Sequence, residues 1–118
     1  MSRGQQRGQA AENQACEYLQ RKGLHLIERN YRCRQGEIDL VMSDADTIVF
    51  IEVRYRSNPA FGSATESVDR RKQSKLIVTA SHYLQQAPSH AQRPARFDVI
   101  SMSGNSLEWI RDAFQAAP

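Results

Sequence analysis

The sequence predicts a single α/β domain over residues 1–118, with helices flanking a mixed β-sheet in the order α-β-β-β-α-β. Two segments repeat apolar residues at helical spacing, and four shorter segments carry the alternation or β-branched content of strands. The length suits one hydrophobic core. Apolar residues make up 40% of the chain, a normal share for a globular domain, so we expect an ordered chain.

The first helix is expected over about residues 6–22, where apolar residues recur at helical spacing and Gly23 is placed to end it. The second is expected over about residues 67–86, with its apolar positions on one side and most of its cations elsewhere. Residues 107–114 are compatible with a last strand or with a helical turn, and the pattern leaves that choice open.

Strands are predicted where apolar residues alternate or β-branched residues gather, at residues 24–31, 37–42, 48–55 and 96–102. Residues 57–66 have the Pro, Gly and Ser content of a loop. Within residues 37–42, a period of two puts Ile38, Leu40 and Met42 on one face. Glu37, Asp39 and Val41 then fall on the other face.

Asp39 and Glu52 attract attention because each carboxylate lies inside an apolar strand. Burying an unpaired carboxylate is costly, so each should have a partner. The turn between the two strands is short, which predicts an antiparallel hairpin. If that turn has an even number of residues, the carboxylates share a face, with Cβ atoms about 5 Å apart. Two carboxylates so close repel each other unless a cation lies between them.

A divalent cation suits this arrangement, since Mg²⁺ takes one or two carboxylates and completes its shell with water and phosphate oxygens. Such an ion activates water and stabilises the charge that develops on a phosphate. Arg54, two residues beyond Glu52, would sit beside that phosphate. The alternative is structural: Glu52 is neutralised by Arg54 or Arg56 on an edge strand, because ion-pair networks and active sites look alike in sequence.

The net charge of +3 is unevenly distributed. Residues 1–34 hold seven Lys/Arg and three acids, and residues 35–53 hold five acids and no base. Residues 54–75 hold six bases and two acids. An acidic segment between two basic ones suits a protein that binds a polyanion while presenting a cation to it. Solvated surface charge is the alternative.

Several motifs resemble the YraN-like family of small uncharacterised bacterial proteins. They are Gly36-Glu37-Ile38-Asp39-Leu40-Val41, Val49-Phe50-Ile51-Glu52-Val53-Arg54-Tyr55-Arg56, Phe61-Gly62 and Val68-Asp69-Arg70-Arg71-Lys72-Gln73. Ala11-Glu12, Ala15, Tyr18-Leu19 and Lys22-Gly23 near the start, and Arg96-Phe97-Asp98-Val99 near the end, fit the same pattern. The agreement runs in order along nearly the whole chain.

That family is similar to the restriction-endonuclease-like PD-(D/E)xK nucleases, which include archaeal Holliday-junction resolvases. The resemblance implies a restriction-endonuclease-like core in which Asp39 and Glu52 bind the metal. It places Glu12 as an additional acidic member and puts Arg54 at the lysine of the motif. Arg54 departs from the pattern, because arginine binds phosphate well but does not give up its proton.

The leading hypothesis is therefore a nuclease that uses Mg²⁺ or Mn²⁺ to cut DNA, with branched or otherwise structured DNA among the candidate substrates and DNA expected before RNA. The candidates for backbone contacts are Arg56, Arg70, Arg71, Lys72, Gln73 and Lys75. The second hypothesis is a nucleic-acid-binding module that keeps the fold without catalysis. The third is a protein-interaction or regulatory domain, in which the carboxylates serve structure alone.

We expect a cytoplasmic protein. Residues 1–8 are polar and basic, which predicts no secretory signal peptide, and no window approaches the length of a membrane span. Cys16 and Cys33 lack metal-ligand spacing and are expected to be reduced. A homodimer is compatible with the exposed sheet edge expected of such a small fold, although no motif in the sequence specifies one.

Overall fold

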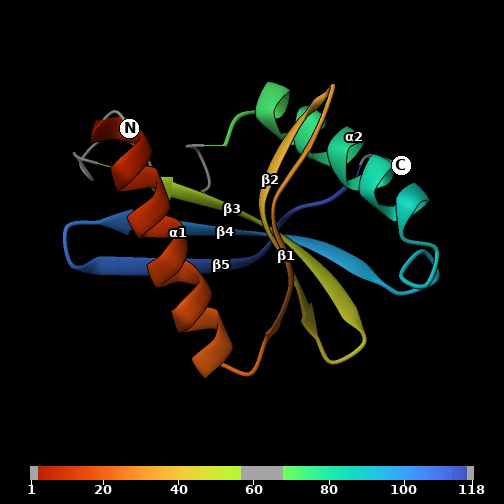
Figure 1. Ribbon diagram of the computed structural model, residues 1–118, viewed down its shortest axis with the longest axis horizontal. Helices are drawn as coiled ribbons and strands as arrows, with labels where there is room; N and C mark the ends of the chain where they lie inside the picture. The colour runs from red at the N-terminus through yellow and green to blue at the C-terminus, as the bar shows by residue number, and fades with distance from the viewer. Residues whose placement is uncertain (1–2, 57–67, 117–118) are drawn as a thin grey trace.

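The computed structural model describes residues 3–56 and 68–116, in which two helices flank a five-stranded sheet (Figure 1). The elements are α1 (Arg3–Arg21), β1 (His25–Cys33), β2 (Gly36–Asp44), β3 (Thr47–Tyr55), α2 (Arg70–Gln86), β4 (Ala95–Ser103) and β5 (Ser106–Phe114). The predicted element order is confirmed, and residues 107–114 belong to a strand. The predicted loop at residues 57–66 lies outside the described residues.

The sheet is mixed, as predicted, and its strands stand in chain order from β1 to β5. Antiparallel pairing joins β1 to β2, β2 to β3 and β4 to β5, whereas β3 and β4 run parallel. A parallel connection needs a crossover, and α2 lies within the segment that makes it. The crossover therefore begins after β3, the strand that carries Glu52.

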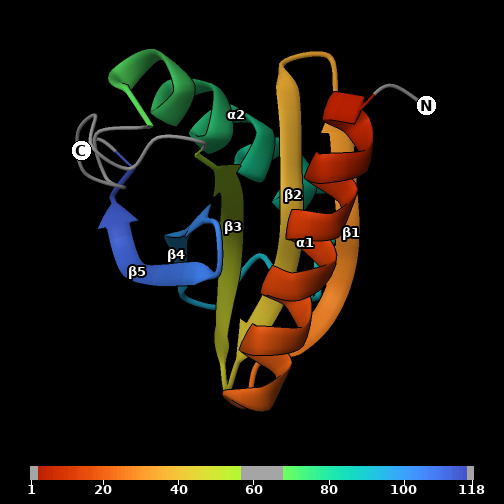
Figure 2. The same ribbon diagram turned by 90° about the vertical axis from the view of Figure 1, so that its left-hand side faces the viewer.

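The two helices cover opposite faces of the sheet (Figure 2). On one face, Ala15 and Leu19 of α1 pack in a cluster that includes Leu40 of β2. On the other, Leu76 and Ala80 of α2 pack in a second cluster with strand residues. Residues from β2, β3 and β4 contribute to both clusters, so these central strands are buried on both sides.

The alternation predicted for β2 is wrong at one position. Leu40 and Met42 pack on the α1 side as expected, but Ile38 packs with Val41 on the α2 side. The change of face lies opposite Asn30 of β1, which has a left-handed backbone with φ of 54°. A left-handed residue within a strand changes its local twist, and a simple period of two does not anticipate this.

Helix α1 ends where the sequence predicts. Gly23 has φ of 100°, a conformation that favours glycine, and the backbone N–H of Leu24 donates to the carbonyl of Leu19. No helix within residues 3–56 and 68–116 combines the length and apolar character needed to cross a membrane. Cys16 and Cys33 are both free thiols, as expected.

Candidate functional site

Asp39 and Glu52 occupy matching positions on the adjacent strands β2 and β3. The last pair in the β2–β3 register joins Leu40 to Ile51, and each acid is the next residue along its strand beyond that pair. Two turn residues, Ala45 and Asp46, separate the strands, so the condition of an even turn is met. The carboxylate of Asp39 accepts the backbone N–H of Val53, with 2.8 Å between Oδ2 and N.

The electrostatics of Asp39 reflect this proximity. Burial, and then the negative charge of Glu52, raise the pKa of Asp39 to about 8, although the hydrogen bond from Val53 acts in the opposite direction. Burial also raises the pKa of Glu52, which is 6% exposed. Near neutral pH the carboxyl of Asp39 is therefore largely protonated, because its surroundings do not compensate a second negative charge beside Glu52.

Two cations approach Glu52 from different elements. Nζ of Lys72, in the first turn of α2, lies 3.5 Å from Glu52 Oε1, and Nη1 of Arg54 lies 3.8 Å from the same oxygen. Both cations lower the pKa of Glu52, but burial outweighs them. These contacts place Glu52 on the sheet face covered by α2. The contact between Arg54 and Glu52 was also expected under the structural alternative, in which an arginine neutralises Glu52.

Local sequence explains why Lys72 reaches this position. Asp69 caps α2, and its carboxylate accepts the backbone N–H of Lys72 at 2.9 Å. The side-chain amide of Gln73 donates to the carbonyl of Val68 at 2.9 Å, which ties the helix to the residue before its cap. Gln73, predicted to bind nucleic acid, therefore has a structural contact at the start of α2.

Asp98 is a buried carboxylate whose hydrogen-bond acceptors are occupied by donors from neighbouring residues of the fold. Its side chain is fully buried and accepts hydrogen bonds from Arg96 Nε at 3.0 Å, from Trp109 Nε1 at 2.9 Å and from the backbone N–H of Asp112 at 2.9 Å. Among the residues that the structure describes, Asp39 has one such bond, from Val53. The contrast indicates that Asp39 is less fully compensated than a purely structural carboxylate.

Glu12, the additional acid expected from the resemblance, lies on α1. Its carboxylate is 3.8 Å from Arg29, and the Asn30 amide, oriented with its nitrogen toward the acids, bridges Glu12 and Glu37 at 3.0 and 3.1 Å. The charge of Glu12 contributes to the raised pKa of Asp39. Even so, among residues 3–56 and 68–116 no three His, Cys, Asp or Glu side chains gather at metal-binding distances.

A positively charged hollow of about 500 Å³ opens beside the acids. Within the described part of the chain, its lining consists of Arg54, Asp69, Arg71, Lys72 and Lys75. Four of these five residues are cationic, and all four were predicted to contact phosphate. Arg56, Arg70 and Gln73 do not line it. Arg70 is exposed at the first position of α2, and the backbone N–H of Arg56 donates to the carbonyl of Met102 just beyond β3.

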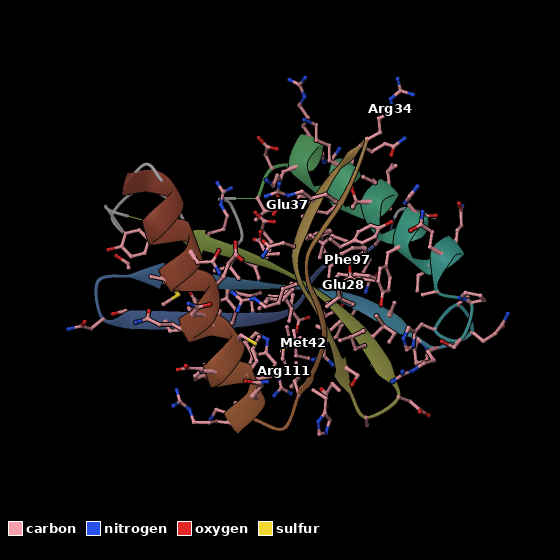
Figure 3. The ribbon with its side chains drawn as sticks, viewed as in Figure 1. Glu28, Arg34, Glu37, Met42, Phe97 and Arg111 are labelled. Carbon is pink, nitrogen blue, oxygen red and sulfur yellow. The ribbon has the colours of Figure 1, made fainter. Side chains whose placement is uncertain are left out.

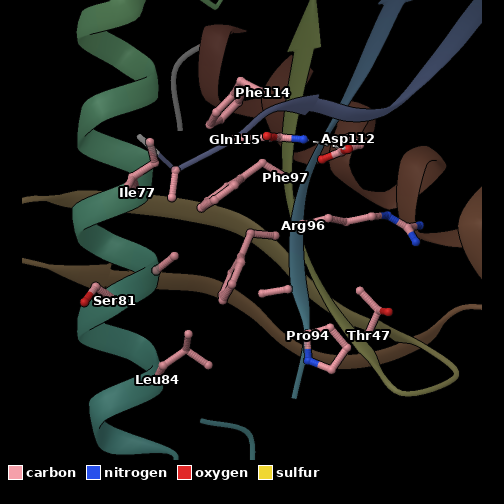
Figure 4. A pocket seen from close by; sticks show the side chains of 14 residues that line it. Thr47, Ile77, Ser81, Leu84, Pro94, Arg96, Phe97, Asp112, Phe114 and Gln115 are labelled. Atoms are coloured by element: carbon pink, nitrogen blue, oxygen red, sulfur yellow. Dashed lines mark hydrogen bonds between the residues drawn. The ribbon is translucent and has the colours of Figure 1, made fainter. Parts of the chain in front are cut away.

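A larger hollow of about 710 Å³ lies between α2 and the ends of β4 and β5 (Figure 4). Its lining is mainly apolar, with Ile77 and Leu84 of α2 facing the aromatic rings of Phe97 and Phe114. Asp39 and Glu52 do not line it. The smaller hollow is therefore the better candidate site, because its cations lie beside Glu52, the buried partner of Asp39.

The sequence did not indicate that Lys72 contacts Glu52 directly. A helix cap at Asp69 was the available signal, since it fixes which residues fall in the first turn. A further cation was also missed: Arg34 lies at the tip of the β1–β2 hairpin and projects away from the sheet beside α2 (Figure 3). Gly36, at the base of that tip, packs directly on Lys75 and Thr79 of α2.

Comparison with known proteins places this chain in a family. The family model described as "Uncharacterised protein family UPF0102" matches residues 11–102. A UPF0102 protein of Pseudomonas savastanoi pv. phaseolicola is 54% identical over 117 residues, covering 95% of each chain. One from Pseudomonas putida (strain GB-1) is 52% identical over 113 residues, covering 92% of each chain.

A third relative, from Nitrosococcus oceani, is 48% identical over 113 residues, covering 92% of this chain and 91% of its own. The names of these relatives carry a family designation and no activity. Because the match spans most of the chain, the YraN-like resemblance drawn from the sequence is confirmed, and the protein belongs to the uncharacterised protein family UPF0102.

Proposed function

We propose that this protein is a metal-dependent nuclease that hydrolyses phosphodiester bonds in DNA. The observation that carries the proposal is the pairing of the buried Glu52 with the half-buried Asp39 beside a hollow lined by four cations. A purely structural pair would be expected to have a fuller set of hydrogen-bond donors, as Asp98 has. A divalent cation supplies the missing positive charge.

Asp39 and Glu52 fit Mg²⁺ or Mn²⁺ by the chemistry of their donor atoms. Hard divalent cations prefer carboxylate oxygens, and Mg²⁺ commonly takes two carboxylates and keeps several waters. Two acids therefore suffice, and Glu12 would act on the pair through its charge. When bound, the metal would activate water and neutralise charge on the phosphate.

Arg54 serves this proposal as a phosphate ligand. Its guanidinium is partly exposed in the hollow, and it can donate two hydrogen bonds to one phosphate group. Arg71 and Lys75 line the same hollow and would contact neighbouring phosphates. Contacts of this kind give affinity and register without reading sequence, so we expect recognition of DNA structure more than of base sequence.

The test is a cleavage assay with Mg²⁺ or Mn²⁺ on plain duplex, four-way junction and single-stranded DNA. We expect cutting of at least one substrate by the unmodified protein and its loss in Asp39→Asn and Glu52→Gln. Asp46→Asn is the matched control, because it removes an exposed acid from the β2–β3 turn. Undiminished cutting by Glu52→Gln would overturn the proposal.

A second candidate is a nucleic-acid-binding module without catalysis. Arg54 favours it, since an arginine stands where the resemblance puts a lysine and it lies 3.8 Å from Glu52. In that case DNA would bind with a steep dependence on salt, and no substrate would be cut with either metal. Mutation of Asp39 or Glu52 would then leave DNA affinity within a few fold of the unmodified protein.

A further inference from the structure

We propose that Asn30 is a positioning residue that holds the carboxylate of Glu12 beside the acid pair. This role rests on the proposed nuclease function. Asn30 belongs to β1, and the β1–β2 register places it opposite Asp39. Its side-chain amide nitrogen donates to Glu12 of α1 at 3.0 Å and to Glu37 of β2 at 3.1 Å. One neutral side chain thus joins two acids from different elements next to the strand position of Asp39.

The backbone of Asn30 is unusual for a residue within a strand. Its φ of 54° lies in the left-handed region, which is costly for most side chains and is tolerated by asparagine. The pairing with β2 continues on both sides of it, at Arg29 and at Tyr31. A left-handed residue kept between two regular pairs stores strain, and strain of this kind gathers at functional sites.

The two acids that Asn30 joins are held unequally. Glu37 has a second partner on the hairpin, since its Oε2 lies 3.2 Å from Nε of Arg32. Glu12 has a weaker one, with its Oε1 3.8 Å from Nη2 of Arg29, although only 15% of its side chain is exposed. Glu37 is therefore an anchor, and Asn30 connects Glu12 to it. Without the amide, Glu12 would be free to turn toward Arg29.

The position of Glu12 matters for a cation held by Asp39 and Glu52. No three acids gather at metal-binding distances in the described ranges 3–56 and 68–116, so Glu12 would act on the cation through space. Coulombic attraction falls with distance, so its strength depends on where the Glu12 carboxylate is held. Residues that act on a metal from outside its ligand shell typically change its affinity by roughly 10–100-fold when they are mutated.

Asn13 provides a matched control in the same interface. Its side-chain oxygen accepts Nη2 of Arg29 at 2.7 Å, so it too joins α1 to β1 through a side-chain hydrogen bond. Asn13 is exposed, and within the described part of the chain it makes no hydrogen bond to an acid. Asn13→Ala and Asn30→Gly therefore each remove a contact between the helix and the strand, but only Asn30→Gly releases Glu12.

The experiment measures Mn²⁺ binding by calorimetry, without DNA, in the unmodified protein, Asn30→Gly, Glu12→Asp and Asn13→Ala. Glycine keeps the left-handed backbone at position 30. Glu12→Asp keeps the negative charge, but its shorter side chain cannot meet the Asn30 amide at the same place. Asn30→Gly and Glu12→Asp should bind Mn²⁺ at least about 10-fold more weakly, and Asn13→Ala should stay within about twofold of the unmodified protein.

A double-mutant cycle shows whether Asn30 acts through Glu12. Glu12→Gln has no charge to position, so adding Asn30→Gly to it should weaken Mn²⁺ binding by no more than about twofold further. If Asn30 served the strand structure alone, its effect would not depend on the charge at position 12. Asn30→Gly would then weaken binding equally in both backgrounds, which would overturn the proposal.

The remaining outcomes are distinguishable from failure of the proposed function. If the unmodified protein binds no Mn²⁺, the metal-dependent nuclease proposal fails and the role of Asn30 fails with it. If binding is present and is lost in Glu52→Gln, while Asn30→Gly binds as tightly as the unmodified protein, the metal site stands and Asn30 does not position it. Should circular dichroism show that Asn30→Gly is unfolded, undiminished binding in Glu12→Asp would overturn the proposal instead.

Discussion

The carboxylate of Asp39 accepts the backbone N–H of Val53 across the β2–β3 pair, with 2.8 Å between the two atoms. The side chain thereby supplies an acceptor just beyond the point where the β2–β3 pairing stops, at Leu40 and Ile51. This bond holds the Asp39 carboxylate toward β3, where Glu52 lies next to Val53. The hairpin geometry therefore maintains the two acids as neighbours despite their mutual repulsion.

The raised pKa of Asp39 predicts that stability falls as pH rises. The carboxyl of Asp39 binds its proton more tightly in the folded protein than in the unfolded chain. The free energy of unfolding therefore falls as the pH rises from 3.8, the ordinary pKa of this group, to about 8, and it stays constant above that pH. The slope is at most about 1.4 kcal/mol per pH unit. In Asp39→Asn, the side-chain amide oxygen can still accept the backbone N–H of Val53, and the side chain does not ionise.

Asp39→Asn should therefore be more stable than the unmodified protein at pH 8 and no more stable at low pH. Urea denaturation in the presence of a chelator, from pH 4 to 9, measures this. Asp46→Asn, at an exposed turn residue, should follow the curve of the unmodified protein. Parallel curves for Asp39→Asn and the unmodified protein would show that Asp39 has an ordinary pKa.

Metal should stabilise the fold, and more strongly at high pH. A metal ligand must lose its proton, so Mg²⁺ or Mn²⁺ should bind Asp39 more tightly at pH 8 than at pH 6. A ligand present at 100 times its Kd adds about 2.7 kcal/mol of stability. The melting temperature should rise with metal in the unmodified protein and in Asp46→Asn. An equal rise in Glu52→Gln would place the metal elsewhere.

Asp98 should matter for stability and not for the proposed chemistry. Asp98→Ala leaves the N–H of Trp109 and the guanidinium of Arg96 without their buried acceptor. Removing one partner of a buried ion pair costs about 3–5 kcal/mol. Urea denaturation should show a loss of this size, whereas Mn²⁺ binding by whatever fraction remains folded should be unchanged. A loss below about 1 kcal/mol would contradict the structural role.

The cationic hollow should determine how DNA affinity responds to salt. Removing a side chain that binds one phosphate reduces the slope of log affinity against log salt by about 1. Arg71→Ala and Lys75→Ala should each do so in a filter-binding or anisotropy titration. Arg21→Ala, at the exposed end of α1, is the control and should leave the slope unchanged. Equal effects from all three would indicate diffuse attraction rather than a site.

Most of the fold is predictable from the sequence because its signals are local. The period of two in β3 and β4, the capping glycine after α1 and the short turn before β3 each depend on nearby residues. Ile38 lies on the face opposite to the predicted one because the backbone of Asn30, on another strand, alters the twist there. The fifth strand is ambiguous in sequence because its pattern also fits a helical turn.

For the candidate site, the sequence predicted the pairing of Asp39 with Glu52, because a hairpin makes distant residues neighbours by simple counting. It could not predict the contact of Lys72 with Glu52, which depends on how α2 crosses the sheet. Nor could it show that Gln73 holds the start of that helix. The nuclease-like core, the metal and the DNA partner stay predictions that the experiments above address.

Gly36 lets the β1–β2 hairpin rest on α2 with no side chain between them: a Cβ atom there would come within 2.9 Å of Thr79 Oγ1. That hydroxyl already donates to the carbonyl of Lys75 at 2.7 Å, so it has little room to yield. An alanine at this point would act as a spacer between the hairpin and the helix. The substitution Gly36→Ala would therefore increase the distance between Lys72 and the two acids, Asp39 and Glu52, without changing the charge of any residue.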